Sequence, residues 1–172
     1  MTTSREMVLI GGVVNSLRSR GSWTGETHIQ KTAYVAKIRR NVPFESEFVL
    51  YKHGPFSFEL SKSIGHMLSR DLLSSENNRG YGPSYALNRS LWTALNKGLS
   101  DFYSDFSNAI DDIGIRFSNK NVAELERIAT AVYVVDKHPH DSDEFRAEII
   151  TKIKPHISRE TALEALQEAA EI

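Results

Sequence analysis

The segment 136–141, which reads Asp-Lys-His-Pro-His-Asp, holds the residue types best suited to metal chemistry. His138 and His140 are two positions apart and have carboxylates on both sides, and divalent metals accept these ligands. Pro139 favours an extended or turn geometry, however, and Asp141 is accounted for as the N-cap of a following helix. We therefore interpret the segment as a polar loop between helices. A metal-dependent nuclease that uses the two histidines remains an outlying hypothesis.

The other chemically capable residues do not form a catalytic motif. The sequence contains no HExxH zinc motif, no Walker A or GxGxxG phosphate loop and no GxSxG nucleophile elbow. The pair Gly11-Gly12 lies inside a helical pattern, which favours close packing over a phosphate-binding loop. His28, His53 and Glu26 would form a group only if the fold brought them together. We therefore expect a non-enzymatic protein with no cofactor and no metal.

Polar and basic side chains on one side of a short helix suggest contact with DNA. This helix is predicted to begin after Ser57, with its apolar residues on the opposite side. The side chains expected to contact bases or phosphates are Lys62, His66 and Ser69 on the helix, Arg79 at the tip of a following hairpin, and Arg39, Arg40 and Lys52 at the flanks. No arginine lies at the centre of this face, and Glu59 at its border would repel phosphate. Docking of a protein therefore remains the alternative use of the surface.

Phe56 and Phe58, beside Gly54-Pro55, are candidates for contact with a partner protein. Burial of an aromatic side chain contributes a few kcal/mol, so leaving Phe58 exposed in isolation would be costly. Either the ring packs against the C-terminal helices of the chain, or it anchors a partner. We expect the first and keep both residues as partner-docking candidates.

Residues 1–89 have the element order of a winged helix-turn-helix. Apolar periodicity predicts helices over 3–19 and 26–40, and a third helix after Ser57. Strand formers around the polar turn at 75–80 predict a hairpin that resembles a wing in size. An additional strand at 48–51 could pair with this hairpin and give a three-stranded sheet.

Residues 90–172 are predicted to be helical. One helix is expected from Leu91 to about Asp112, a second after the capping box Asn121-x-x-Glu124, and two more that begin near Asp141 and at Ser158. The predicted fold is therefore mainly α (α+β): a winged helix-turn-helix with a C-terminal helical bundle packed on it as one compact unit.

Charge is distributed unevenly along the 172 residues. Residues 1–89 hold 12 Lys and Arg against 7 Asp and Glu, whereas residues 90–172 hold 9 against 15. A basic first half and an acidic second half suggest different partners, DNA for the first and a homodimer or partner protein for the second. The chain has no cysteine and no apolar run of the roughly 20 residues that a membrane span requires, so we expect a cytoplasmic protein.

Several motifs resemble a bacterial family, the YwgA-like proteins, which are relatives of the Panacea (SocA-like) antitoxin domain. The matching segments are Gly25–Lys31 with Tyr34, Tyr51–Ser57 with Leu60, Ala129–Val135, and Ile153–Ser158 leading into Ala162–Leu166. The Gly-Pro-aromatic-Ser block before a helix is the most specific of them. The resemblance implies a winged-helix protein from a mobile-element, toxin–antitoxin or defence locus. It implies binding to a toxin or other partner as strongly as binding to a promoter, and it transfers no catalytic residue.

From the sequence we therefore expect a winged-helix regulator or adaptor that contacts DNA. The alternative is a protein-interaction module, antitoxin-like or part of a defence complex, that does not bind DNA.

Overall fold

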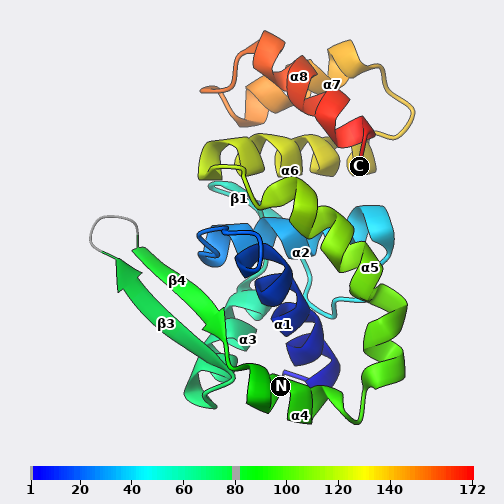
Figure 1. The fold of residues 1–172 in the computed structure, drawn as a ribbon. Coiled ribbons are helices and arrows are strands. Elements are labelled where there is room, and N and C mark those ends of the chain that lie inside the picture. Colours follow the sequence, from blue (N-terminus) through cyan, green and yellow to red (C-terminus); the bar gives the residue numbers. More distant parts are fainter. Residues whose placement is uncertain (1, 79–81) are drawn as a thin grey trace.

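The computed structural model describes residues 2–78 and 82–172, and over these residues the chain forms eight helices and two antiparallel hairpins (Figure 1). The helices are α1 (Ser4–Arg18), α2 (Glu26–Arg40), α3 (Phe58–Ser69), α4 (Arg89–Asn96), α5 (Ser100–Phe117), α6 (Val122–Lys137), α7 (Asp143–Ile153) and α8 (Arg159–Ala170). The strands are β1 (Val49–Tyr51), β2 (Gly54–Phe56), β3 (Leu73–Asn78) and β4 (Gly82–Leu87). The predicted mainly helical class is confirmed.

Helix α1 lies at the centre of the N-terminal half and packs against α2, α3, α4, α5 and β4. Its two glycines give neighbouring rings close access to the helix backbone: Trp92 of α4 lies against Gly11, and Tyr103 of α5 lies against Gly12. The interpretation of this pair as a close-packing site is therefore confirmed. The single helix predicted over 91–112 is wrong, because the chain breaks around Gly98 into α4 and α5 and both helices contact α1.

The first hairpin corrects the predicted sheet. Strand β1 pairs with β2 in the register Val49↔Phe56 and Tyr51↔Gly54, and it does not join β3 and β4. The φ of +84° at Gly54 lets the chain reverse after the turn and begin β2. Pro55 is accommodated because a strand of three residues at a sheet edge tolerates the missing N–H.

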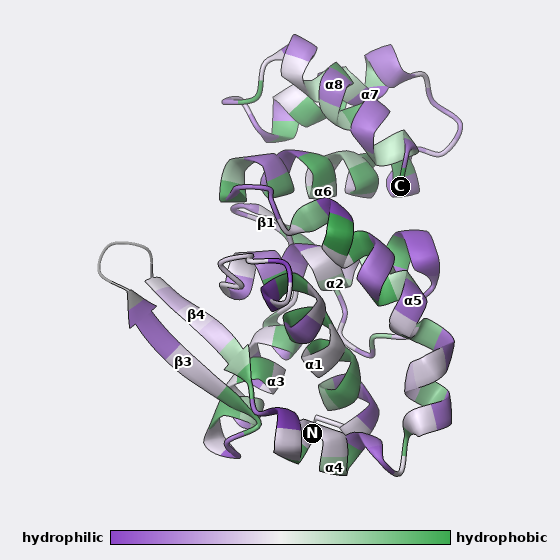
Figure 2. Cartoon of the chain, viewed as in Figure 1, coloured by the Kyte–Doolittle hydropathy of each residue, from purple (hydrophilic) through white to green (hydrophobic). Residues whose placement is uncertain are grey.

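Helix α3 and the second hairpin follow. The Ser57 hydroxyl accepts a hydrogen bond from Leu60 N, so the predicted N-cap is confirmed. Strands β3 and β4 pair from Leu73↔Leu87 to Asn78↔Gly82 and project away from the helices (Figure 1). Figure 2 shows that the projecting part of this hairpin is mostly hydrophilic or neutral and that its hydrophobic residues gather at its base.

Helices α6, α7 and α8 form the C-terminal part, with α6 packed on α2 and β2 and with α7 and α8 packed on α6. The capping box of Asn121 and Glu124 and the N-cap Ser158 are confirmed. Asp141 is not the N-cap of α7; Ser142 takes that position, and Asp141 interacts with His138 instead. Among the described residues, no helix is both long and apolar enough to cross a bilayer.

Candidate functional site

Hairpin β1–β2 and the first residue of α3 present a group of hydrophobic side chains, which we call the aromatic surface: the exposed Val49, Tyr51 and Phe58 and the half-buried Phe56. Val49, Tyr51 and Phe58 are 49%, 54% and 53% exposed. The ring centroids of Phe56 and Phe58 lie 5.1 Å apart, and those of Tyr51 and Phe58 lie 5.3 Å apart. The expectation that Phe58 packs against the C-terminal helices is wrong, because its ring packs against the hairpin and keeps half of its surface in solvent.

Local geometry explains why these side chains meet. Val49 and Tyr51 alternate with Leu50, so both project from the same face of β1. The register places Phe56 directly opposite Val49. Gln30 of α2 then fixes the exit from the hairpin, because its side-chain amide donates to Ser57 O and accepts from Ser57 N, both at 2.9 Å. The start of α3, and with it Phe58, is therefore held at a defined place beside β2.

Behind the hairpin lies a buried group of charges, the lysine–glutamate cluster of Lys31, Glu126 and Lys154. Lys31 is 2% exposed, and its ammonium donates to Pro55 O at 2.7 Å. Lys154 Nζ lies 3.3 Å from Glu126 Oε1 and donates to Tyr51 O at 3.1 Å and to Lys52 O. Burial lowers the pKa of Lys31 from 10.5 to about 8, although the nearby Glu126 carboxylate opposes this shift. The cluster connects α2, α6 and the end of α7 to the carbonyls of hairpin β1–β2.

Two histidines complete the outer side of this cluster. His53 Nδ1 and His156 Nε2 each lie 3.5 Å from a carboxylate oxygen of Glu126. His28 is elsewhere, with its Nε2 3.1 Å from Lys120 O, so the structure does not join His28, His53 and Glu26 into one group. The sequence analysis did not predict the lysine–glutamate cluster. The one feature of the sequence that could have indicated it is Lys31, a charged residue within the apolar stretch of α2.

The outward side of α3 carries three of the residues predicted to contact DNA. Lys62 and Ser69 are exposed, and His66 is half-buried between them. The Ser69 hydroxyl donates to His66 O at 2.8 Å, so it is engaged with its own helix. Glu59 is also exposed and accepts a hydrogen bond from Glu47 N at 2.7 Å. Helix α3 packs on α1, α2 and β3, which leaves this side facing solvent.

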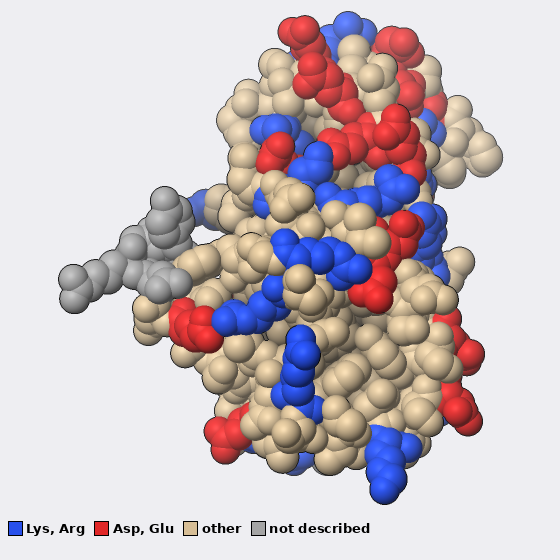
Figure 3. All heavy atoms as spheres, in the orientation of Figure 1, with Lys and Arg blue, Asp and Glu red and all other residues tan. Residues whose placement is uncertain are grey.

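The other predicted DNA contacts lie on different elements. Arg39 donates to Ala169 O of α8 at 2.6 Å, and Arg40 donates to the carboxylate of Asp112 on α5. Lys52 lies in the turn between β1 and β2. Arg79 falls outside the residues that the structure describes. On the face shown in Figure 3, acidic side chains gather over α7 and α8, and basic side chains are spread over the middle of the molecule.

A cavity of about 600 Å³ beside α3 is lined by Glu6, Glu45 and Glu59 together with Lys62 and His66. Glu6 is buried and accepts hydrogen bonds from Glu45 N and Ser46, and desolvation raises the pKa of its carboxyl. Three carboxyl groups next to one lysine disfavour a phosphate at this edge of α3.

The loop between α6 and α7 holds His138 and His140. His138 Nδ1 lies 2.9 Å from Asp141 Oδ2, and His140 is exposed. Over residues 2–78 and 82–172, no three His, Asp or Glu side chains are grouped so that they could hold a metal ion.

Comparison with known proteins finds no match to a family model and no match among curated proteins. Three of the four segments that carry the family resemblance nevertheless lie close together in the structure. Gly25–Lys31 forms the start of α2, Tyr51–Ser57 forms the hairpin and its exit, and Ile153–Ser158 connects α7 to α8. Each of these segments supplies a residue to the lysine–glutamate cluster or to its flanking histidines, directly behind the aromatic surface.

Proposed function

We propose that the protein is a non-enzymatic interaction module that binds a partner protein on its aromatic surface. The observation that carries this proposal is the exposure of about half of Tyr51 and Phe58 in a contiguous group of rings. Complete burial of such a side chain contributes about 1.5–3 kcal/mol. Aromatic side chains of this kind dominate the energetics of protein interfaces.

The charges around the aromatic surface indicate the chemistry of the partner. Lys52 follows Tyr51 in the hairpin, and Lys62 lies one helical turn after Phe58 on the same side of α3. Both lysines are exposed, and neither forms an ion pair within the described part of the chain. Lys62 also lies beside Glu6, Glu45 and Glu59, so Lys52 is the cation that is open to an acidic group. A partner segment with apolar side chains and an Asp or Glu next to Lys52 is complementary to this arrangement.

The resemblance to YwgA-like and SocA-like proteins supports the same function. Its most specific block, Gly54–Ser57, forms β2 and the N-cap of α3, and so builds part of the aromatic surface. An antitoxin-like or defence-complex subunit that neutralises or recruits its partner through this surface accords with that family.

In-cell photo-crosslinking tests the proposal. A photoreactive phenylalanine analogue at Val49 lies within the surface and leaves the three rings intact, and the same analogue at Ile115, which is 57% exposed on α5, is the matched control. We expect one protease-sensitive adduct of defined mass from position 49 and none from position 115. Lys52→Glu should strongly reduce the yield of that adduct. A nuclease-sensitive adduct, or equal adducts from both positions, contradicts the proposal.

DNA binding through a winged helix-turn-helix is the second candidate, favoured by the exposed side of α3 beside the projecting hairpin β3–β4. About four phosphate contacts would give a salt slope near −3.6, and therefore a roughly hundredfold loss of affinity between about 50 and 200 mM salt. Fluorescence anisotropy with a generic duplex measures this slope. A flat or absent response rejects this candidate and leaves the interaction module standing.

A further inference from the structure

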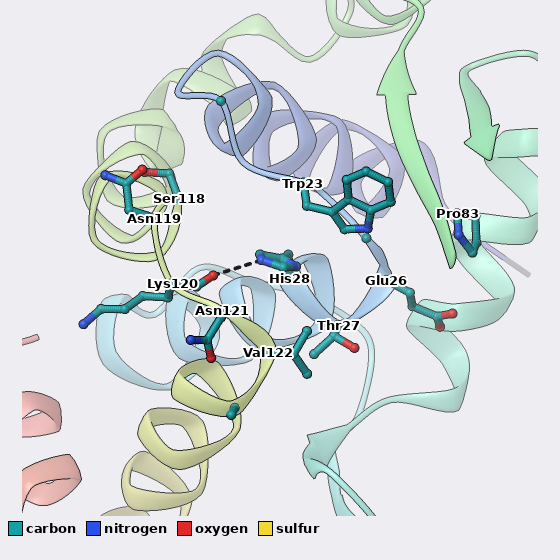
Figure 4. Close-up of a pocket in the computed structure, with 13 residues that line it drawn as sticks. Trp23, Glu26, Thr27, His28, Pro83, Ser118, Asn119, Lys120, Asn121 and Val122 are labelled. Carbon is teal, nitrogen blue, oxygen red and sulfur yellow. Dashed lines mark hydrogen bonds between the residues drawn. The ribbon is translucent and has the colours of Figure 1, made fainter. Parts of the chain in front are cut away.

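A pocket of about 810 Å³ lies on a different part of the molecule from the aromatic surface, between the start of α2, the linker from α5 to α6, and the hairpin residue Pro83 (Figure 4). Its wall includes Trp23, Thr27 and His28 on one side and the segment 118–123 on the other. The first turns of two long helices, α2 and α6, therefore line the same volume.

These helix starts supply hydrogen-bond donors. Gly25 caps α2 without a side-chain hydrogen bond, so the N–H groups of the first turn, including Thr27 and His28, lack the usual capping acceptor. In α6 the capping box provides acceptors for Asn121 N and Glu124 N. It provides none for the first-turn N–H groups of Val122 and Ala123. The positive ends of both helix dipoles add to a potential that favours an anion.

His28 is an independent indication of a ligand. The side chain lines the pocket and is only 5% exposed. Its Nε2 lies 3.1 Å from the carbonyl oxygen of Lys120, so Nε2 carries the proton and donates. Nδ1 is then a buried nitrogen with no hydrogen-bond partner. Such groups are rare in native proteins and typically indicate a bound water, an ion or a functional role.

We propose that this pocket binds the phosphate group of a small molecule at the starts of α2 and α6, and that Nδ1 of His28 takes one proton from solvent when the phosphate binds. The protonated imidazole then donates from both nitrogens, to Lys120 O and to the anion. Thr27 contributes a hydroxyl at the same helix start.

The charged groups around His28 permit this proton uptake. Glu26, on the same turn, also lines the pocket, but its carboxylate points away from the imidazole (Figure 4), and its buried Oε1 has no hydrogen-bond partner. From the linker, the Lys120 ammonium pairs with Glu168 of α8, and from α6 the Glu124 carboxylate accepts from Asn121 N. Burial lowers the pKa of His28, and the hydrogen bond to the Lys120 carbonyl opposes this shift. An anion in the pocket reverses the balance.

Sulfate is the probe for this linkage, because it mimics phosphate and keeps both charges across the pH range of the experiment. Binding is followed by amide chemical shifts of Thr27, His28, Val122 and Ala123 in the full chain. Since one proton is taken up, the sulfate affinity should rise as pH falls, by at most about tenfold per pH unit. Unchanged amides at these positions, or an affinity that does not depend on pH, would overturn the proposal.

Three variants test whether the pH dependence of sulfate binding comes from His28. His28→Gln keeps an N–H donor for Lys120 O and removes the titrating nitrogen, so it should weaken sulfate binding at low pH at least tenfold and abolish its pH dependence. Thr27→Ala should weaken binding severalfold with the pH dependence retained. His140→Gln, an exposed histidine outside the pocket, is the matched control and should behave as the wild type. Wild-type behaviour of His28→Gln, with its fold verified by circular dichroism, refutes the assignment.

A final pair of titrations identifies the source of the phosphate. Inorganic phosphate and adenosine monophosphate should each displace sulfate, and tighter binding of the nucleotide would assign the rest of the pocket to the organic part. Adenosine alone should not shift the four amides. If adenosine shifts them as strongly as the nucleotide does, the phosphate site is rejected.

Discussion

The lysine–glutamate cluster makes a sharp prediction about stability. Glu126→Gln keeps the size of the side chain but leaves Lys31 and Lys154, 2% and 5% exposed, without a carboxylate. Removal of one partner from a buried ion pair costs about 3–5 kcal/mol. Because both ammonium groups keep their carbonyl acceptors in the hairpin, we expect the lower end of this range, about 3 kcal/mol at pH 7.

The stability lost in Glu126→Gln should depend on pH in a defined direction. The pKa of Lys31 is about 8 in the folded protein and 10.5 in the reference state, so between these values the unfolded chain binds more protons and the stability of the wild type rises with pH. Without Glu126, which holds the pKa of Lys31 up, that pKa falls further and the rise begins nearer neutral pH. The deficit of Glu126→Gln relative to the wild type should therefore shrink as pH increases from 7 to about 10.

Urea unfolding followed by circular dichroism measures both effects. Glu148→Gln, an exposed residue of α7, is the matched control and should lie within about 0.5 kcal/mol of the wild type. A loss below about 1 kcal/mol for Glu126→Gln, or a deficit that grows with pH, would refute this account of the cluster.

Three further predictions concern packing and the site. Gly12→Ala should lower the free energy of unfolding, measured by thermal unfolding, by about 2 kcal/mol, because the new methyl group meets the Tyr103 ring, although alanine is the better helix former. Gly65→Ala, whose methyl group would point into open space on α3, should raise the free energy of unfolding by up to about 1 kcal/mol. Gln30→Leu should lower the free energy of unfolding, measured in urea, by about 2 kcal/mol, because it leaves the buried Ser57 N without a partner and leaves Ser57 O with the bond from Ser61 N alone. Phe58→Ser should lose no more than about 1 kcal/mol in the same assay, because half of the ring is already in solvent.

Each of these has a contrary outcome. Equal effects of alanine at the two glycine positions would show that helix propensity, not contact with Tyr103, dominates. A neutral Gln30→Leu would mean that water replaces the amide at the exit from β2. A loss of several kcal/mol for Phe58→Ser would make the aromatic surface part of the core.

Local chemistry made much of the fold predictable. The starts of α3, α6 and α8 follow from Ser57, Asn121 and Ser158, whose side chains bond to backbone N–H groups within three residues. Hairpin β1–β2 was not predictable in this way. Its turn, Lys52-His53, lacks the Asn-Gly or Asp-Gly signal of tight hairpins, and the buried ammonium groups of α2 and Lys154 hold its carbonyls from elements distant in the sequence.

The candidate site was partly predictable for the same reason. Sequence alone identified Phe56 and Phe58 as aromatic residues at a helix start, and Lys62, His66 and Ser69 as one side of α3. It did not place Arg39 and Arg40, since their orientation depends on contacts with α8 and α5. It also gave no sign that the linker before α6 lies against His28, because that proximity is a property of helix packing.

The binding of the recovered partner is the most direct test of the central claim, that the aromatic surface holds another protein. The protein isolated from the adduct at position 49 would be purified and titrated against the wild type, Tyr51→Ser with Phe58→Ser, and the control Ile115→Ser. We predict that the double variant binds at least about a hundredfold more weakly, corresponding to about 2.7 kcal/mol, while Ile115→Ser matches the wild type. Equal affinities for all three proteins would contradict the claim.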